Sequence, residues 1–249
     1  MELGLAGKVA LVTGGSRGIG AAIALLLLES GCEVTVTART KESLEALIET
    51  APTSIRTRLK IIACDFDDEE QVTQLAQHVA ATQIDVLVNC AGINQIGLAE
   101  DVAHEDFLRI QRVNVAAPFK LSKAVIGGMA SRNWGRIVNV TSIFGSVSKA
   151  HRLSYSTSKF ALHGMTKALA LDYAEKGVLV NAVAPGVIDT TLTKNVLGED
   201  GVKKMLASIP LRRLGQPGEI AKLIVFLASE ANSYITGQQI IIDGGYTSV

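Results

Sequence analysis

Cysteine is scarce in this sequence: its 249 residues contain three, at positions 32, 64 and 90. An odd number of widely separated cysteines, each among apolar residues, excludes a disulfide framework. No cluster of His, Cys and Asp has the spacing of a metal site. We therefore expect small core thiols in a reducing compartment, the cytoplasm, and no bound metal.

Neither sign of charge prevails, because Lys and Arg together number 24 and Asp and Glu together also number 24. The chain therefore has no net field that would draw nucleic acid or an anionic membrane. The apolar run at residues 21–28 is far shorter than the roughly 20 residues that span a bilayer. The N-terminus lacks the basic segment of a signal peptide. We expect neither nucleic acid nor membrane as a partner.

Apolar runs with β-branched residues alternate with longer helical patterns along the whole chain. Strands are expected at residues 8–13, 33–39, 59–64, 84–92, 136–142, 178–186 and 238–243, and helices at 19–28, 41–49, 104–132, 154–176 and 217–229, with another beginning at the acidic sequence DDEE. This alternation predicts an α/β fold with a doubly wound parallel sheet covered by helices on both faces. No linker or repeat interrupts it, so we expect one domain over residues 1–249.

A glycine turn, GGSRGIG, joins the first expected strand to the first expected helix. Gly14 permits a tight turn, Gly18 lets the backbone approach a pyrophosphate, and Gly20 allows close helix packing. The helix N-terminus would then face the phosphates. The turn, whose other members are Ser16, Arg17 and Ile19, is therefore a candidate dinucleotide site.

Arg39 ends the second expected strand, 19 residues after Gly20. An acidic residue near this place binds the ribose 2′-hydroxyl of NAD, whereas arginine suits the 2′-phosphate of NADP. Arg17 could supply a second cation. We expect NADP(H) rather than NAD(H), with the alternative that both arginines are solvated surface charges.

Further candidates for the cofactor site follow the third and fourth expected strands. Asp65, with Phe66 after it, is placed either to approach the adenine or to cap the next helix. Asn89, Ala91 and Gly92 end the fourth strand. Their small size would let the chain pass beneath a flat ring system.

Ser142, Tyr155 and Lys159 form the candidate catalytic group. Tyr155 and Lys159 are four residues apart, so on a helix they share one face, while Ser142 ends an expected strand at the ligand crevice. Lowering a phenol pKa from about 10 to about 7 requires roughly 4 kcal/mol. A unit charge at about 4 Å supplies that order of energy at an effective dielectric constant of about 20. We expect Lys159 to lower the phenol pKa, Tyr155 to exchange a proton with substrate, and Ser142 to hold the substrate oxygen.

Asn114 lies within the long helix expected at residues 104–132, in which Pro118 should cause a bend or a break. A buried asparagine needs hydrogen-bond partners. Asn114 is therefore either a satisfied core amide or a residue linked through water to Lys159.

Together with the glycine turn, the ordered set Asn89-Cys90-Ala91-Gly92, Asn114, Ser142, Tyr155, Lys159 and Pro185-Gly186 resembles the short-chain dehydrogenase/reductase family over nearly the whole chain. The resemblance implies a single Rossmann domain with a seven-stranded sheet and hydride transfer between nicotinamide C4 and a carbonyl or alcohol carbon. It implies a catalytic tetrad of Asn114, Ser142, Tyr155 and Lys159. It also implies that Pro185, Gly186, Ile188, Thr190, Tyr155 and Lys159 bind the cofactor, and that the protein is a homotetramer.

Within that family, the sequences RRLGQPGEIA and YITGQQIIIDGG resemble those of the 3-oxoacyl-(acyl-carrier-protein) reductases and related sugar, polyol and ketone reductases. A ketone or 3-oxoacyl reductase is the expected function. The alternatives are an NAD(H)-dependent sugar, polyol or hydroxy-acid dehydrogenase and a non-catalytic dinucleotide sensor.

The substrate pocket is expected to have a mixed polar and apolar lining, beside a lid at residues 190–209. Its candidate residues are Ile93, Asn94, Phe144, His151, Arg152, Val187 and Leu192. Lys149, His151 and Arg152 are either a solvated basic face or an attraction for an anionic substrate. Arg132 and Lys176 could receive an acidic acyl carrier protein, or could be ordinary helix C-terminal charges.

Overall fold

A sheet of seven parallel strands is the centre of the computed structural model, which describes residues 2–248, with residues 192, 194–197 and 199 described by backbone alone. The strands are β1 (Val9–Val12), β2 (Glu33–Ala38), β3 (Leu59–Ala63), β4 (Val86–Asn89), β5 (Gly135–Val140), β6 (Val178–Pro185) and β7 (Gln239–Ile242). Their order across the sheet is β3-β2-β1-β4-β5-β6-β7. Each expected strand is present, and the fold class predicted from the alternating pattern is confirmed.

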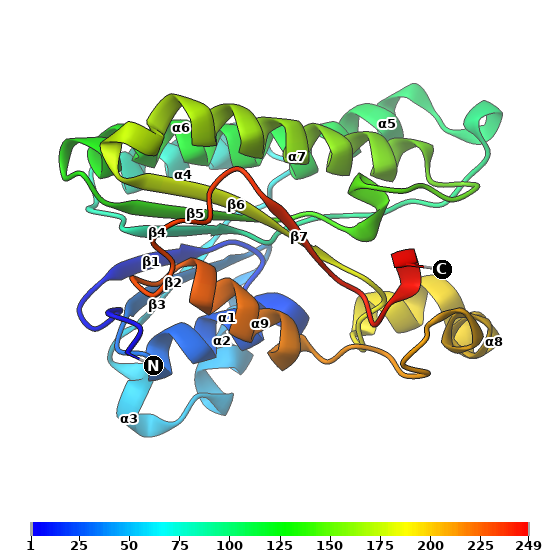
Figure 1. The fold of residues 1–249 in the computed structure, drawn as a ribbon, viewed down its shortest axis with the longest axis horizontal. Coiled ribbons are helices and arrows are strands. Elements are labelled where there is room, and N and C mark those ends of the chain that lie inside the picture. Colours follow the sequence, from blue (N-terminus) through cyan, green and yellow to red (C-terminus); the bar gives the residue numbers. More distant parts are fainter. Residues whose placement is uncertain (1, 249) are drawn as a thin grey trace.

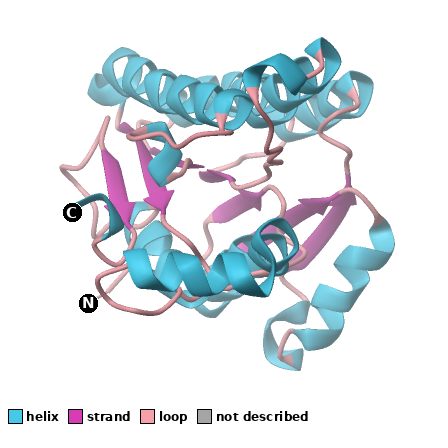
Figure 2. Ribbon diagram, turned by 90° about the vertical axis from the view of Figure 1, so that its right-hand side faces the viewer, coloured by secondary structure: helices cyan, strands magenta, loops and turns pink. Residues whose placement is uncertain are grey.

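Helices cover both faces of the sheet, as Figures 1 and 2 show. They are α1 (Gly18–Glu29), α2 (Lys41–Thr50), α3 (Thr53–Arg56), α4 (Glu69–Ala80), α5 (His104–Gln111), α6 (Ala117–Ser131), α7 (Leu153–Tyr173), α8 (Thr191–Ser208) and α9 (Pro217–Leu227). In Figure 1, α4, α5, α6 and α7 lie above the sheet, and α1, α2 and α9 lie below it. Two clusters of buried apolar residues fill the two spaces between the helices and the sheet.

The sheet changes direction between β1 and β4. From β1 the chain moves outward to β2 and β3, then returns to β4 and moves outward through β5, β6 and β7. At such a switch point the loops after the two central strands separate and leave a crevice at their carboxyl ends. The glycine turn follows β1 and the segment Cys90–Gly92 follows β4, so both candidate cofactor segments lie at this crevice.

The long helix expected at residues 104–132 is broken by a π-helical turn, η2 (Arg112–Ala116), between α5 and α6. Pro118 has no backbone N–H, and its ring would clash with the carbonyl of the residue four positions earlier. That residue is Asn114, at the centre of the π turn. The break predicted from Pro118 therefore occurs just before the proline and sets Asn114 in a widened turn.

Two other segments differ from the sequence expectation. The short helix α3 was not expected; it follows Pro52, which starts it. The lid expected at residues 190–209 is mostly helix α8, with a non-helical residue, Gly198, inside it at φ 64°. Within residues 2–248, none of the helices combines the length and the apolar character needed to cross a bilayer.

Candidate functional site

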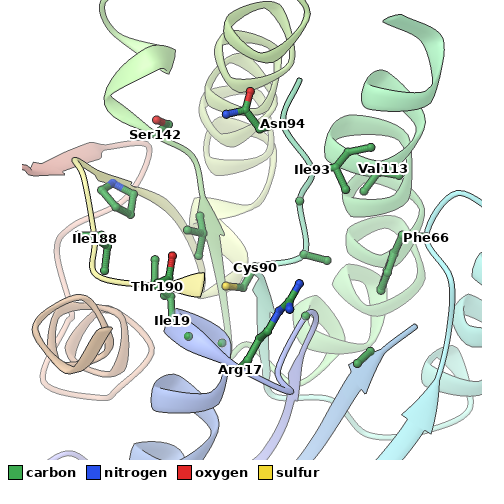
Figure 3. A pocket seen from close by; sticks show the side chains of 18 of the residues that line it. Arg17, Ile19, Phe66, Cys90, Ile93, Asn94, Val113, Ser142, Ile188 and Thr190 are labelled. Atoms are coloured by element: carbon green, nitrogen blue, oxygen red, sulfur yellow. The ribbon is translucent and has the colours of Figure 1, made fainter. Parts of the chain in front are cut away.

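A cavity of about 460 Å³ occupies the crevice at the carboxyl ends of the central strands. It is shown in Figure 3, where Arg17 and Ile19 lie below, and Ser142 and Asn94 lie above. The predicted site residues that line it are Gly14, Ser16, Arg17, Gly18, Ile19, Gly20, Arg39, Asp65, Phe66, Ala91, Gly92, Ile93, Asn94, Ser142, Tyr155, Lys159, Pro185, Gly186, Ile188 and Thr190. The glycine turn and the candidate catalytic group of Ser142, Tyr155 and Lys159 therefore line the same cavity.

The glycine turn is too tight for side chains at two of its positions. Gly14 has φ 66°, and a Cβ there would lie 2.8 Å from the Cα of Ala91. A Cβ on Gly20 would lie 2.2 Å from the carbonyl oxygen of Gly14. Helix α1 begins here without an acidic residue in its first turn or a side-chain cap. Its first N–H groups therefore suit a phosphate, and the turn fits the pyrophosphate of a dinucleotide.

Arg17 and Arg39 are both exposed and line the cavity. Among the described residues, neither guanidinium is in an ion pair with a carboxylate. Two uncompensated guanidinium groups suit a phosphate, which accepts paired N–H donors.

Asp65 lines the cavity and also holds the local turn, but it does not cap the helix that follows. Its Oδ1 accepts a hydrogen bond of 3.0 Å from the N–H of Asp67. The cap of α4 is a different residue, Asp68, whose carboxylate accepts from the N–H groups of Glu70 and Gln71. Asp65 is therefore a turn residue with its carboxylate beside the cavity.

Asp67 is a cavity residue that the sequence reasoning missed. Its carboxylate pairs with Arg109 at 2.9 Å and with Arg112 at 3.0 Å. The two arginines are three residues apart and so share a helix face, and this spacing was the sequence feature that could have predicted a carboxylate partner. The two ion pairs hold the loop after β3 against the end of α5.

Asn89 is the cofactor candidate that the structure places elsewhere. Its side chain is buried and donates to Asn139 at 2.8 Å and to Ser122 at 3.4 Å. It does not line the cavity, because it is the last residue of β4 and its amide is turned toward partners on β5 and α6. The neighbouring Cys90 lines the cavity instead, and burial raises the pKa of its thiol to about 12.

Thr13 joins the two strands that border the crevice. Its Oγ1 accepts hydrogen bonds from the N–H groups of Cys90 at 2.9 Å and Ala91 at 3.0 Å. The loop after β4 is thereby held against the end of β1, and the floor of the cavity is fixed.

Lys159 reaches the cavity from α7 and is almost fully buried. Its Nζ donates a 2.9 Å hydrogen bond to the carbonyl oxygen of Val140 and lies 5.6 Å from the centre of the Tyr155 ring. Burial lowers the pKa of this amine to about 8. Near neutral pH, Lys159 therefore holds a proton that it can readily release.

The pKa of Tyr155 differs from the expectation. Burial raises it above its ordinary value of 10.0, against the lowering effects of a hydrogen bond with Ser142 and the charge of Arg152. The main causes of the shift do not include Lys159, whose own charge is disfavoured by desolvation. Ser142 and Arg152, rather than the lysine, favour the phenolate in this structure.

Asn114 is a satisfied core amide. Its Oδ1 accepts from the N–H of Ile93, and its Nδ2 donates to the carbonyl oxygen of Ile93 and to Ser158 Oγ, at 2.9 to 3.0 Å. A Cβ on Gly92 would lie 3.3 Å from Asn114 Oδ1 and 3.4 Å from Lys159 Nζ. Asn114 therefore clamps the loop after β4 to α7, close to the lysine.

The expected substrate-pocket residues separate into groups. Ile93 and Asn94 line the cavity, whereas Phe144, His151, Arg152 and Val187 do not. The side chain of Leu192 lies outside the described residues. In the basic group, Lys149 and His151 are exposed, but Arg152 is buried, so a solvated face describes only the first two.

The basic residues considered for a carrier protein are engaged with their own chain. Arg132 pairs with Asp85 at 3.1 Å and donates to the carbonyl of Ile84. The Nζ of Lys176 lies 5.3 Å from the Tyr173 ring centre. Among the described residues, no three His, Cys, Asp or Glu side chains gather as a metal site would require.

Comparison with known proteins gives one consistent family. Residues 14–247 match the family model described as enoyl-(acyl carrier protein) reductase. The 3-oxoacyl-(acyl-carrier-protein) reductase FabG of Vibrio cholerae is 40% identical over 256 residues, which cover 98% of each chain. That of Aquifex aeolicus is 38% identical over 247 residues, which cover 98% of this chain and 99% of the relative.

Solved structures agree with this match. A protein described as an NAD(P)-dependent gluconate 5-dehydrogenase from Beutenbergia cavernae, with NADP bound at low occupancy, has a TM-score of 0.92 and 34% identity over the whole of both chains. ElxO with NADP bound has a TM-score of 0.90 and 35% identity, over 98% of this chain and all of the other. The chain therefore belongs to the short-chain dehydrogenase/reductase family of NAD(P)-dependent oxidoreductases, which act on CH–OH and C=O groups, and it resembles the 3-oxoacyl-(acyl-carrier-protein) reductases.

Proposed function

We propose that the protein is an NADP(H)-dependent reductase of a ketone or 3-oxoacyl group, with Tyr155 as the general acid. The observation that carries this proposal is the convergence of Ser142, Tyr155 and Lys159 on the cavity that also holds the glycine turn. When bound, NADPH supplies the hydride. The remaining chemistry is a proton transfer to the carbonyl oxygen, which this chain's own residues perform.

Each of the three residues has a distinct part. Ser142 Oγ donates a hydrogen bond to the substrate oxygen and holds it beside the phenol. Tyr155 Oη gives its proton to that oxygen as negative charge develops there. Lys159 Nζ, with its pKa near 8, returns a proton to the resulting phenolate. Asn114 acts indirectly, because it holds the loop after β4 against α7, the helix that carries Lys159.

The preference for NADP(H) is supported by Arg17 and Arg39, which line the cavity without carboxylate partners among the described residues. The ribose 2′-phosphate carries about two negative charges, for which paired guanidinium donors are well suited. NADP is also the molecule bound in two similar structures. We expect Arg39 to contact the 2′-phosphate from the end of β2.

The relatives support two substrate classes. The FabG relatives point to a 3-oxoacyl group on an acyl carrier protein. Against this, Arg132, which the sequence offered as a contact for the carrier protein, is already in an ion pair with Asp85. The gluconate dehydrogenase neighbour points to a hydroxy acid. A reducing, cytoplasmic location is supported by three free cysteines.

A homotetramer is proposed from the apolar residues that α6 and α7 leave uncovered. Phe119 on α6 is 51% exposed, and on α7 Phe160 is 46% and Leu171 is 84% exposed. Residues 160 and 171 lie on one face of α7, since eleven residues make just over three whole turns. An apolar face of this kind on neighbouring helices is typical of a surface that pairs with another copy.

The experiment that tests the function compares wild type with Tyr155→Phe, following NADPH absorbance over a panel of ketones, 3-oxoacyl thioesters and oxo acids. We expect turnover to fall about 100-fold or more, the range for loss of a general acid. NADPH binding, measured by its fluorescence, should stay within about twofold. Unchanged turnover in Tyr155→Phe would reject the role of the phenol, and no turnover of any compound by wild type would favour a dinucleotide sensor.

A further inference from the structure

A buried cation without a partner lies next to the reactive phenol. Arg152 is only 8% exposed, and its Nη1 is fully buried without a hydrogen bond. Among the described residues, no carboxylate pairs with this guanidinium, whose central carbon lies over the Phe144 ring, 5.4 Å from the ring centre. A buried charge of this kind is costly unless something compensates it.

The position of Arg152 relates this cation to the substrate. Arg152 is the N-cap of α7 and precedes Tyr155 by three residues, so both lie on the same turn. The phenols of Tyr155 and Tyr246 are the groups whose charge acts on its pKa, which burial lowers. Tyr246 belongs to the C-terminal turn η5 (Tyr246–Ser248), remote in sequence from the glycine turn. Arg152 is not itself among the residues that line the cavity, but it lies on the helix turn that carries the reactive phenol.

The first turn of α7 has no acidic residue that could compensate the charge of Arg152. Helix α7 begins without an acidic residue and without a side-chain cap, so its positive N-terminal end adds to the field of the guanidinium. The hydroxyl of Ser154 and Oδ1 of Asn94, which lines the cavity, are also buried without hydrogen-bond partners. Leu153 beside Arg152 is 48% exposed. The chain thus exposes a leucine and buries an arginine, the reverse of what folding alone favours.

We propose that Arg152 binds a carboxylate of the substrate, so that the protein reduces a small oxo acid whose free carboxylate lies close to the reacting carbonyl. A guanidinium binds a carboxylate through two parallel N–H···O bonds, and the planar pair would orient the carbonyl toward Tyr155 Oη and Ser142 Oγ. An acyl chain on a carrier protein has no such charge near its carbonyl, because the phosphate of the carrier arm is many bonds away.

This inference rests on the proposed reductase function and deepens it, so its test uses matched substrates. The 2-, 3-, 4- and 5-oxo acids and their methyl esters are compared by kcat/KM with NADPH, for wild type, Arg152→Gln, Arg152→Lys and the control Lys149→Gln. Lys149 is an exposed member of the same basic group. We expect wild type to prefer at least one acid to its ester by about 30-fold or more, as for truncation of one partner of a buried charge pair.

Arg152→Gln should lose this preference, because KM rises for the acid and not for the ester. The loss of its charge beside Tyr155 should change kcat for acid and ester alike. Arg152→Lys should recover part of the preference, and Lys149→Gln should keep it. The melting temperature of Arg152→Gln should be unchanged or higher, because an unpaired buried charge is removed. Equal use of acid and ester by wild type, or an equal loss for both in Arg152→Gln, would overturn the proposal.

A binding measurement separates this proposal from the reductase function itself. Calorimetric titration of the NADPH-bound protein with the oxo acids and with their esters reports recognition whether or not turnover follows. Binding of an acid by wild type that Arg152→Gln abolishes supports the carboxylate site even if the reductase assay is negative. Acid binding that is absent from wild type, or equal in both proteins, contradicts it.

Discussion

Lys159 Nζ donates its hydrogen bond to the carbonyl oxygen of Val140, at 2.9 Å, and so connects α7 to the end of β5. The acceptor is a neutral carbonyl, and burial disfavours the charged amine. The lysine that we propose for proton transfer is therefore held where its charged form is disfavoured. This position has a measurable consequence for the stability of the whole protein.

Stability should rise with pH through the titration of Lys159. Burial lowers its pKa from 10.5 to about 8, so between these values the unfolded state binds more protons than the folded state, and raising the pH favours folding. We expect the unfolding free energy of wild type, relative to Lys159→Met, to increase by about 2 kcal/mol between pH 8 and pH 10.

Urea denaturation of both proteins over that range measures this difference. The buried cysteines, whose pKa values burial raises to about 11 or 12, are common to both proteins, so their titration cancels. A difference in unfolding free energy that does not change with pH would show that the folded-state lysine keeps its ordinary pKa.

Cofactor preference should depend on Arg39. Replacing it with Asp removes a donor to the 2′-phosphate and adds a repelling charge, so kcat/KM with NADPH should fall about 100-fold, as for loss of hydrogen bonds to a charged group. The value with NADH should be unchanged or higher. Lys41→Asp is the control, because Lys41 is exposed nearby and pairs only with Glu45 on its own helix among the described residues. Equal losses with both cofactors would contradict the assignment.

The glycine turn should not tolerate even a methyl group at position 20. In Gly20→Ala the new Cβ would meet the carbonyl oxygen of Gly14 at 2.2 Å, so the turn must open or the helix must move. We expect a loss of about 2 kcal/mol or more in unfolding free energy and a weakened affinity for NADPH. Gly218→Ala on α9, where a Cβ meets nothing within 4 Å, should be neutral or stabilising by up to about 1 kcal/mol. Similar results for the two variants would show that the turn adapts.

Assembly should depend on the uncovered face of α7. Light scattering at micromolar concentration should give a tetramer for wild type and a smaller species for Phe160→Glu, because the new carboxylate would be desolvated in the interface. Lys60→Glu is the control: it also makes the protein more negative, but at an exposed position on the edge strand β3. This variant should remain tetrameric. A monomeric wild type would refute the assembly.

Much of the fold follows from patterns that are local in sequence. The apolar β-branched runs mark all seven strands to within a few residues, because parallel strands buried on both faces leave little other choice of residue. The break before Pro118 follows from a proline that must displace a particular carbonyl, that of Asn114. The glycine turn is equally local, since positions 14 and 20 admit no side chain.

The parts that sequence reasoning missed depend on contacts between distant segments. The run KAHR is compatible with a solvated basic face or with an attraction for an anionic substrate, and nothing in it predicts that Arg152 is buried beside the Phe144 ring. The pKa of Tyr155 was misjudged because helical spacing gives the distance to Lys159 but not the desolvation of both groups. Asn89 was placed in the cofactor site for the same reason: its amide turns toward Asn139, a residue fifty positions away in the sequence.

The switch of strand order between β1 and β4 divides the cavity between two halves of the chain. The phosphate turn, Arg17 and Arg39 precede β4, whereas Ser142, Tyr155, Lys159 and Arg152 all follow it. The choice of electron carrier and the choice of reactant are thus encoded in separate stretches, joined at residues 89–92. Chimeras of related enzymes, crossed over at that junction, should inherit their coenzyme from one parent and their reactant from the other.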